Sequence, residues 1–287
     1  MPNRVFGVIE GFYRRPYTFE QRLDLIKFLS DLKLNTYMYG PKADPFHRKK
    51  WSEPYPTQKI REFEKLVELC NALSVAFVYA LSPINRLNLE KIVRKIDSII
   101  AAGVTQFSLF FDDIPASLNQ ETADEQVEVA NGLYEHLSAK IENVTLTFCP
   151  TQYRGFRKTQ YIKTMSHKLR REIDVFWTGK SVVAKKITET EIDRINSIVK
   201  RPVLIWDNIF ANDYIPGRIM RFPYRNRAPG IVRKVRGILI NPMNNYKESK
   251  PLIHTAAQFF HDPFNYDPGR AWITALNTTT HADFRHP

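Results

Sequence analysis

Short apolar runs alternate with segments of helical periodicity along most of this chain of 287 residues, and no other feature constrains the fold as strongly. Runs rich in Val, Ile, Leu and aromatic residues are typical of buried parallel strands, and the segments between them are typical of crossover helices. The pattern predicts eight strands, at residues 5–12, 35–39, 75–81, 106–112, 145–149, 175–178, 203–207 and 237–241.

Helix signals fill the gaps between these runs. Residues 18–32 place Leu23, Ile26 and Leu29 on one face, as an amphipathic helix does. A Ser or Thr followed three residues later by Glu or Gln is a capping box, which marks a helix start. It occurs at Thr18/Gln21, Thr122/Glu125 and Thr188/Glu191. We also expect a last helix over 251–260, with Pro251 in its first turn, where a missing N–H costs little.

Eight strand–helix units in this length match a (β/α)8 TIM barrel, which usually takes ~250 residues. The sequence therefore predicts an α/β protein with one catalytic barrel over residues 1–262. Residues 263–287 are expected to form a C-terminal tail that packs on the barrel or extends from it. A doubly wound open sheet is the alternative, but neither G-x-G-x-x-G nor G-x-x-x-x-G-K-[ST] occurs in the chain.

The charge balance raises the question of an anionic partner. Lys and Arg outnumber Asp and Glu by 42 to 30, a net charge of +12. The excess is scattered along the sequence in short clusters such as 168–171 and 225–236, without an aromatic-interleaved basic stripe. We therefore expect a solvated basic surface and not a nucleic-acid site. No apolar run approaches the ~20 residues of a membrane helix, so no membrane partner is expected.

Two cysteines, Cys70 and Cys149, are too few for a disulfide framework or a four-ligand zinc site, and their apolar neighbours indicate reduced core thiols. The seven histidines have no metal-ligand spacing. No metal or cofactor is therefore expected. The first residues lack the pattern of a signal peptide, so a cytoplasmic protein is expected.

Polar and aromatic residues follow seven of the eight predicted strands. Active sites of barrels lie at the carboxyl ends of the strands. Hydroxyl groups of a sugar take hydrogen bonds and its apolar ring faces stack on aromatic rings, so a polar pocket with aromatic walls suits a carbohydrate. The segments concerned are 10–13, 41–44, 112–113, 151–153, 177–179, 206–208 and 241.

Asp112 and Asp113 are the sharpest feature among these strand ends. Phe107, Leu109 and Phe110 indicate a buried strand that ends in two adjacent carboxylates. Burial and mutual repulsion favour a proton on one of them while the other stays ionised, which gives a general acid beside an anion. A helix N-cap, a salt-bridged strand end or a metal site are the alternative interpretations.

The adjacency of the two carboxylates also limits the mechanism. A retaining glycosidase normally separates its acid and its nucleophile by ~5–5.5 Å, and an inverting one uses ~6.5–9.5 Å. Neighbouring residues at one strand end do not easily flank a sugar in that way. If the chain is a glycosidase, the substrate itself can supply the nucleophile, and the carbonyl oxygen of a 2-acetamido group would serve.

Five segments, in order, resemble the motifs of glycoside hydrolase family 84, which comprises O-GlcNAcases and bacterial β-N-acetylglucosaminidases. The similarity extends from residue 6 to about residue 260. The motifs are GVIEGFY at 7–13, LNTYMYGPK at 34–42, FDDI at 111–114, WDNIFANDY at 206–214 and GILINP at 237–242.

The resemblance implies a β-N-acetylglucosaminidase that removes terminal β-linked N-acetylglucosamine from a glycoconjugate or glycoprotein through an oxazoline, with retention and without a cofactor. Asp112 would polarise the acetamide N–H, and Asp113 would act as general acid and then as base. Seven further residues would bind the sugar: Tyr153, Trp206 and Asn208 on the acetamide side, and Gly11 (through its carbonyl), Lys42, Asp213 and Asn241 at the ring hydroxyls.

The chain departs from the family pattern around the pocket that the resemblance implies. Ala43 stands where the family usually has Asp, Arg14 replaces a glycine, and Gln152 stands where Glu is common. The loop that begins at residue 82 lacks the usual Ser-Pro-Gly and is shorter. The sequence thus leaves the aglycone and the oligomeric state open. A related hexosaminidase of different sugar or linkage preference, and a non-catalytic sugar- or nucleic-acid-binding barrel, are the alternatives.

Overall fold

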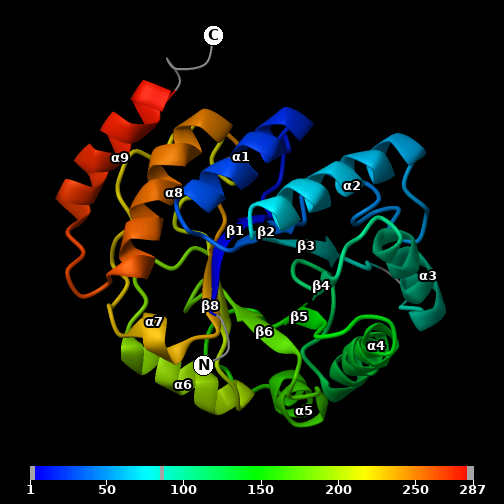
Figure 1. Ribbon diagram of the computed structural model, residues 1–287. Coiled ribbons are helices and arrows are strands. Elements are labelled where there is room, and N and C mark those ends of the chain that lie inside the picture. Colours follow the sequence, from blue (N-terminus) through cyan, green and yellow to red (C-terminus); the bar gives the residue numbers. More distant parts are fainter. Residues whose placement is uncertain (1–3, 85–86, 283–287) are drawn as a thin grey trace.

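A closed barrel of eight parallel strands lies at the centre of the molecule (Figure 1), as the computed structural model of residues 4–84 and 87–282 shows. The strands follow one another around the barrel in sequence order, which confirms the predicted (β/α)8 fold. Each begins and ends within two residues of its predicted range. They are β1 (Val5–Glu10), β2 (Thr36–Tyr39), β3 (Ala76–Leu81), β4 (Gln106–Phe110), β5 (Thr145–Cys149), β6 (Asp174–Trp177), β7 (Leu204–Asp207) and β8 (Gly237–Ile240).

Helices surround this barrel on the outside (Figure 1). In chain order they are α1 (Phe19–Asp31), α2 (Thr57–Ala72), α3 (Leu89–Ile100), α4 (Gln120–Ser138), α5 (Gln160–Lys168), α6 (Glu189–Val199), α7 (Ile231–Lys234), α8 (Tyr246–His261) and α9 (Pro268–Ala282). The segment after residue 262, expected as a tail, includes α9, which packs beside α8. Within the part of the chain that the structure describes, no helix is long and apolar enough to cross a membrane.

Two of the three predicted capping boxes are confirmed. Thr18 with Gln21 and Thr188 with Glu191 exchange both hydrogen bonds that define the motif. The prediction for Thr122 is wrong, because α4 begins at Gln120 and its N-cap is Asn119, three residues before Thr122. Asn119 accepts a hydrogen bond from the Thr122 backbone N–H. Asn is as good a cap as Thr and comes first in the chain.

The predicted start of the last helix is also wrong. The helix that contains Pro251 begins at Tyr246, so Pro251 lies in its interior, and α9 follows it. A proline there removes one backbone hydrogen bond. The helix nevertheless continues because the next residues, Leu252 and Ile253, are completely buried against the barrel, and burial of such side chains is worth ~1.5–3 kcal/mol each.

Glycine permits the close approach of strands where the barrel closes. β1 pairs with β8 in a register that sets Val5 opposite Gly237. A Cβ on Gly237 would lie 1.9 Å from the carbonyl oxygen of Val5, and a Cβ on Gly7 would lie 1.8 Å from that of Thr36. Any side chain at these positions would push neighbouring strands apart.

The apolar residues form two layers. Inward-facing side chains fill the barrel, including Phe110, Phe176 and Trp206. Outward-facing side chains form a larger layer between the strands and the helices. Because successive side chains of a strand point to opposite faces, Trp206 lies inside the barrel and its neighbour Asp207 lies outside it. This alternation decides which strand-end residues face the interior of the barrel.

Candidate active site

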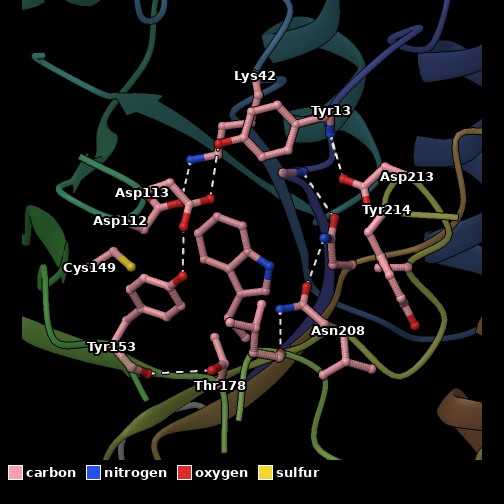
Figure 2. A pocket seen from close by; sticks show the side chains of 16 residues that line it. Tyr13, Lys42, Asp112, Asp113, Cys149, Tyr153, Thr178, Asn208, Asp213 and Tyr214 are labelled. Carbon is pink, nitrogen blue, oxygen red and sulfur yellow. Dashed lines mark hydrogen bonds and ion pairs between the residues drawn. The ribbon is translucent and has the colours of Figure 1, made fainter. Parts of the chain in front are cut away.

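A pocket of about 430 Å³ opens at the carboxyl ends of the strands (Figure 2). All nine residues assigned to the site from the sequence line it: Gly11, Lys42, Asp112, Asp113, Tyr153, Trp206, Asn208, Asp213 and Asn241. Seven lining residues were not assigned: Tyr13, Cys149, Thr178, Val182, Val183, Ala211 and Tyr214. Of these, Tyr13 and Thr178 lie in strand-end segments that the sequence marks as polar, whereas the valines carry no such signal.

Asp112 is a buried carboxylate with one oxygen paired and one without a partner. The Lys42 ammonium donates to Oδ2 at 2.6 Å and balances the charge of the carboxylate. Oδ1 is buried and has no hydrogen-bond partner within the described residues. The salt-bridged alternative for Asp112 is therefore present, but it leaves one strong acceptor at the pocket unsatisfied, which is costly unless a ligand supplies a donor.

Asp113 has an unusual backbone conformation that brings its side chain to the same pocket as that of Asp112. Its φ is +52°, in the left-handed region that Asp tolerates better than most residues. In an extended strand the two side chains would point to opposite faces. The left-handed turn overcomes that alternation, and Arg48 stabilises it by donating from Nη2 to the Asp113 carbonyl oxygen at 2.8 Å.

Two tyrosine hydroxyls donate to the Asp113 carboxylate (Figure 2). Tyr13 Oη lies 2.9 Å from Oδ2, and Tyr153 Oη lies 2.6 Å from Oδ1. Burial and the charge of Asp113 raise the pKa of both tyrosines well above the usual value. Both hydroxyls therefore stay protonated and act as donors at all physiological pH values.

Cys149 lies at the end of β5 and contributes a thiol to the pocket wall. It is a free, buried thiol, as expected. Burial and the nearby charge of Asp112 raise its pKa well above the usual value. The group is therefore a neutral thiol and not a nucleophilic thiolate.

Trp206 forms an aromatic wall. Its ring packs against Phe110 and Phe176, at centroid distances of 4.9 and 5.5 Å. Gly11 allows this position, because a Cβ there would lie 2.2 Å from the indole ring. The Lys42 ammonium lies 5.3 Å from the centroid of the same ring, a favourable cation–π distance.

A chain of amide hydrogen bonds fixes the side of the pocket opposite the carboxylates. The Gly11 N–H donates to Asn241 Oδ1 at 3.2 Å, and Asn241 Nδ2 donates to Asn208 Oδ1 at 2.8 Å. Asn208 Nδ2 then donates to the carbonyl oxygen of Val182 at 2.9 Å. The chain links the ends of β1, β8 and β7 to the loop after β6, so the two amides are held in one orientation.

Asp213 and Arg14 join the loops after β7 and β1. The Tyr13 N–H donates to Asp213 Oδ2 at 2.7 Å, and Arg14 Nε donates to the Asp213 carbonyl oxygen at 2.6 Å. Arg14 has a φ of +71°, which glycine adopts at lower cost. In this chain the Arg14 side chain makes a hydrogen bond with the loop after β7, which a glycine could not make.

Three strand-end carboxylates do not reach the pocket, contrary to the expectation that polar strand ends converge there. Glu10 is fully buried and accepts a bidentate pair of bonds from Arg22. Asp207 likewise accepts two bonds from the guanidinium of Arg227. Asp44 accepts from the hydroxyls of Tyr39 and Tyr55. Glu10 and Asp207 are on the outward face of their strands, where Glu10 joins the barrel to α1 and Asp207 joins it to the loop that precedes α7.

His47 lies completely buried behind the pocket, near the ring of Phe110. Its Nδ1 is 2.7 Å from the carbonyl oxygen of Ala80, while Nε2 has no partner within the described residues. Burial and the charge of Lys42 lower its pKa to about 3. The imidazole is therefore neutral and adds no charge next to Lys42. Among the described residues, no group of three His, Cys, Asp or Glu side chains could hold a metal ion.

The structure is a TIM barrel whose pocket holds adjacent carboxylates beside an aromatic wall, an arrangement that suits a carbohydrate ligand. Comparison with known proteins defines the family. A family model described as beta-N-acetylglucosaminidase matches residues 6–286, and the chain belongs to that family.

Two curated relatives and one solved structure show how far the similarity extends. The "Protein O-GlcNAcase" of Rattus norvegicus and that of Mus musculus are each 35% identical over 278 residues, which cover 90% of this chain and 30% of each relative. An O-GlcNAc hydrolase mutant from Thermobaculum terrenum superposes with a TM-score of 0.92 at 32% identity, covering 96% of this chain and 63% of that one. The chain therefore spans under a third of the curated relatives' length.

Proposed function

We propose that the chain hydrolyses terminal β-linked N-acetylglucosamine from glycoconjugates, with retention of configuration and with the 2-acetamido group as nucleophile. The observation that carries the proposal is the buried, unpartnered Oδ1 of Asp112 next to the accessible carboxyl of Asp113. An acetamide N–H at this position would satisfy the acceptor, and the Lys42 ion pair leaves that oxygen free for it.

The chemical step follows from these two carboxylates. Asp112 accepts a hydrogen bond from the acetamide N–H and so raises the nucleophilicity of the carbonyl oxygen, which attacks C1 while the glycosidic C–O bond breaks. The ring that forms is an oxazoline protonated at nitrogen, and its N–H stays hydrogen-bonded to the Asp112 carboxylate. Asp113 donates its proton to the departing oxygen. In the second step Asp113 takes a proton from water, the water oxygen attacks C1, and the oxazoline ring opens to give the product with retained configuration.

As the acid, Asp113 must come within hydrogen-bond distance of the leaving-group oxygen. In the structure both of its carboxyl oxygens already accept hydrogen bonds from tyrosine hydroxyls, so one hydroxyl must give way. Tyr13 is 40% exposed. We propose that the leaving-group oxygen takes the place of its hydroxyl, whereas Tyr153 stays near the acetamide and the oxazoline.

The remaining lining residues fit the sugar. We propose that Trp206 forms the wall of the pocket around the acetamide methyl group and that Asn208 contacts the acetamide side of the sugar. Four groups are proposed to bind ring hydroxyls: the Gly11 carbonyl, Lys42, Asp213 and Asn241. The orientation of the two amides is already fixed by the hydrogen-bond chain, so little ordering is needed when a sugar binds.

Two measurements on the purified chain test this proposal. A thiazoline that imitates the oxazoline should inhibit far more tightly than N-acetylglucosamine, because the site should complement the cyclised state. Stepwise fluorination of the acetamide methyl in an aryl N-acetylglucosaminide should lower the rate steeply. A flat response to fluorination, or a glycosyl ester trapped on either Asp, would contradict it. Turnover of a different aryl glycoside would favour a hexosaminidase with another sugar or linkage preference. Binding of a sugar without any turnover would favour a non-catalytic barrel.

We propose that the substrate is a glycoprotein and that the chain acts in the cytoplasm. The names of the curated relatives support the first. The two buried thiols, neither of which is in a disulfide, fit a reducing compartment.

A further inference from the structure

The positive charge that is scattered along the sequence gathers at one end of the folded barrel. The loops that follow the strands are residues 11–18, 40–56, 82–88, 111–119, 150–159, 178–188, 208–230 and 241–245. Their described residues include sixteen Lys and Arg but only five Asp and Glu, a net charge of +11 against +12 for the whole chain. Two of the sixteen lie in 11–18, four in 40–56, three in 150–159, three in 178–188 and four in 208–230.

Few of these cations have a counterion within the protein. Lys42, Lys50 and Arg227 pair with Asp112, Glu53 and Asp207. The other thirteen make no ion pair with a carboxylate of the described residues, and twelve of the thirteen side chains are exposed.

The opposite end of the barrel is less charged and better paired. The loops that precede the strands, from residue 32 to residue 236, contain seven basic and two acidic residues. Three of those seven are in ion pairs: Lys140, Arg170 and Arg236. The unpaired excess therefore belongs to the end that carries the pocket.

Several of the unpaired cations lie within two residues of the pocket wall in the chain. Arg154 follows Tyr153, and Lys180 lies between Thr178 and Val182. Both are exposed. A pocket surrounded by charge of one sign raises the local concentration of oppositely charged ligands and speeds their association.

We infer that the aglycone is an acidic polypeptide segment, which extends from the sugar pocket over the cationic loops. This inference rests on the proposed function and adds a substrate class to it. A polypeptide fits because the rim is not uniformly ionic: Tyr13 (40%), Tyr214 (52%) and Val182 (38%) expose large apolar or aromatic surfaces at the mouth. Acidic side chains would pair with the loop cations, and apolar ones would pack on these three residues.

The test compares three synthetic peptides that carry one β-O-linked N-acetylglucosamine and differ only in flanking residues, which are acidic, neutral or basic. An uncharged aryl N-acetylglucosaminide is measured in parallel. At ~50 mM ionic strength, kcat/KM for the acidic peptide should exceed that for the neutral one by at least ~10-fold, and this ratio should approach one near ~0.5 M salt. Turnover of the aryl substrate should not depend on salt in this way.

A pair of triple variants locates the effect. Arg154→Gln, Lys180→Gln and Arg221→Gln together should remove most of the preference for the acidic peptide and leave aryl turnover unchanged. Lys27→Gln, Lys65→Gln and Lys163→Gln remove the same charge from exposed positions on α1, α2 and α5 and should preserve the preference.

The outcomes separate the inference from the proposed function. If kcat/KM is equal for the three peptides while the aryl substrate is still hydrolysed, the inference is overturned and the proposed function stands. No turnover of any substrate defeats the proposed function itself, and competition by an oligonucleotide but not by an acidic peptide would replace the polypeptide with nucleic acid.

Discussion

At the residue scale, the two adjacent carboxylates have distinct surroundings and therefore distinct expected effects. If Asp113 is the acid, as proposed, Asp113→Asn should lower kcat/KM by at least ~10²-fold for substrates with poor leaving groups, because Asn cannot protonate the departing oxygen. Aryl groups that leave without protonation should lose much less. Asp112→Asn should slow both kinds of substrate, since the proposed mechanism places Asp112 at the attacking acetamide. A Brønsted series of aryl glycosides measures the difference, and equal losses across the series for Asp113→Asn would show that it is not the acid.

His47 should make the fold sensitive to acid. Its pKa is about 3 in the folded protein against ~6.5 in an unfolded chain. Between these values only the unfolded chain binds the proton, so the free energy of unfolding falls as the pH drops from 6.5 toward 3. The loss between pH 7 and pH 4.5 should be about 2–3 kcal/mol from this group, at ~1.4 kcal/mol per pH unit.

Urea unfolding at the two pH values measures this effect of His47. His47→Asn keeps an amide donor toward the Ala80 carbonyl but cannot take up the proton, so its stability should fall less on acidification than that of the wild type. The exposed His167→Asn serves as the matched control and should behave like the wild type. An unchanged pH dependence in His47→Asn would assign the acid sensitivity to other groups.

The sequence predicted which residues line the pocket better than it predicted their geometry. The polar strand ends and the segment FDDI indicated the place of the pocket, and the family resemblance supplied nine residues that all line it. The left-handed conformation of Asp113 could not be predicted, because it depends on Arg48 from another loop. The outward placement of Glu10 and Asp207 follows from strand alternation, but the strand ends had to be known to within one residue to apply that rule.

At the element scale, the start of α4 separates a true cap from a matching sequence pattern. Asn119→Ala should destabilise the fold by about 1 kcal/mol, because the Thr122 backbone N–H loses its acceptor. Thr122→Ala should have almost no effect, since that side chain does not cap α4. Thermal or denaturant unfolding of the two variants measures the contrast. A larger loss for Thr122→Ala would reverse the assignment.

The elements themselves were predictable because the period of apolar residues differs between strands and helices. The starts of the helices were harder to predict. Several residues near α4 and α8 satisfy the same rules for a helix start, and packing on the barrel selects among them. Pro251 illustrates the point. Local rules exclude proline from a helix interior, yet α8 continues through Pro251 because the residues that follow it are buried against the barrel.

At the scale of the whole molecule, closure of the barrel depends on the contact between its first and last strands. Gly237→Ala should destabilise the domain by at least about 3 kcal/mol, because the new Cβ meets a backbone oxygen that cannot rotate away. Gly269→Ala in α9 meets only the flexible Asp267 side chain and should be neutral or slightly stabilising. The unfolding midpoints of both variants test this. A tolerated alanine at 237 would show that the β1–β8 seam can widen.

The hydrogen-bond chain from Gly11 through Asn241 and Asn208 has a consequence for the biosynthesis of the protein. It joins groups from the beginning and the end of the barrel sequence. A growing polypeptide leaves the ribosome from its amino end, so Asp112 and Asp113 emerge long before Trp206, Asn208 and Asn241 do. Asp112 and Asp113 therefore stay without Trp206 and the two amides until β8 has been translated. A nascent chain that ends before β8 thus lacks Asn241, the residue that joins Gly11 to Asn208.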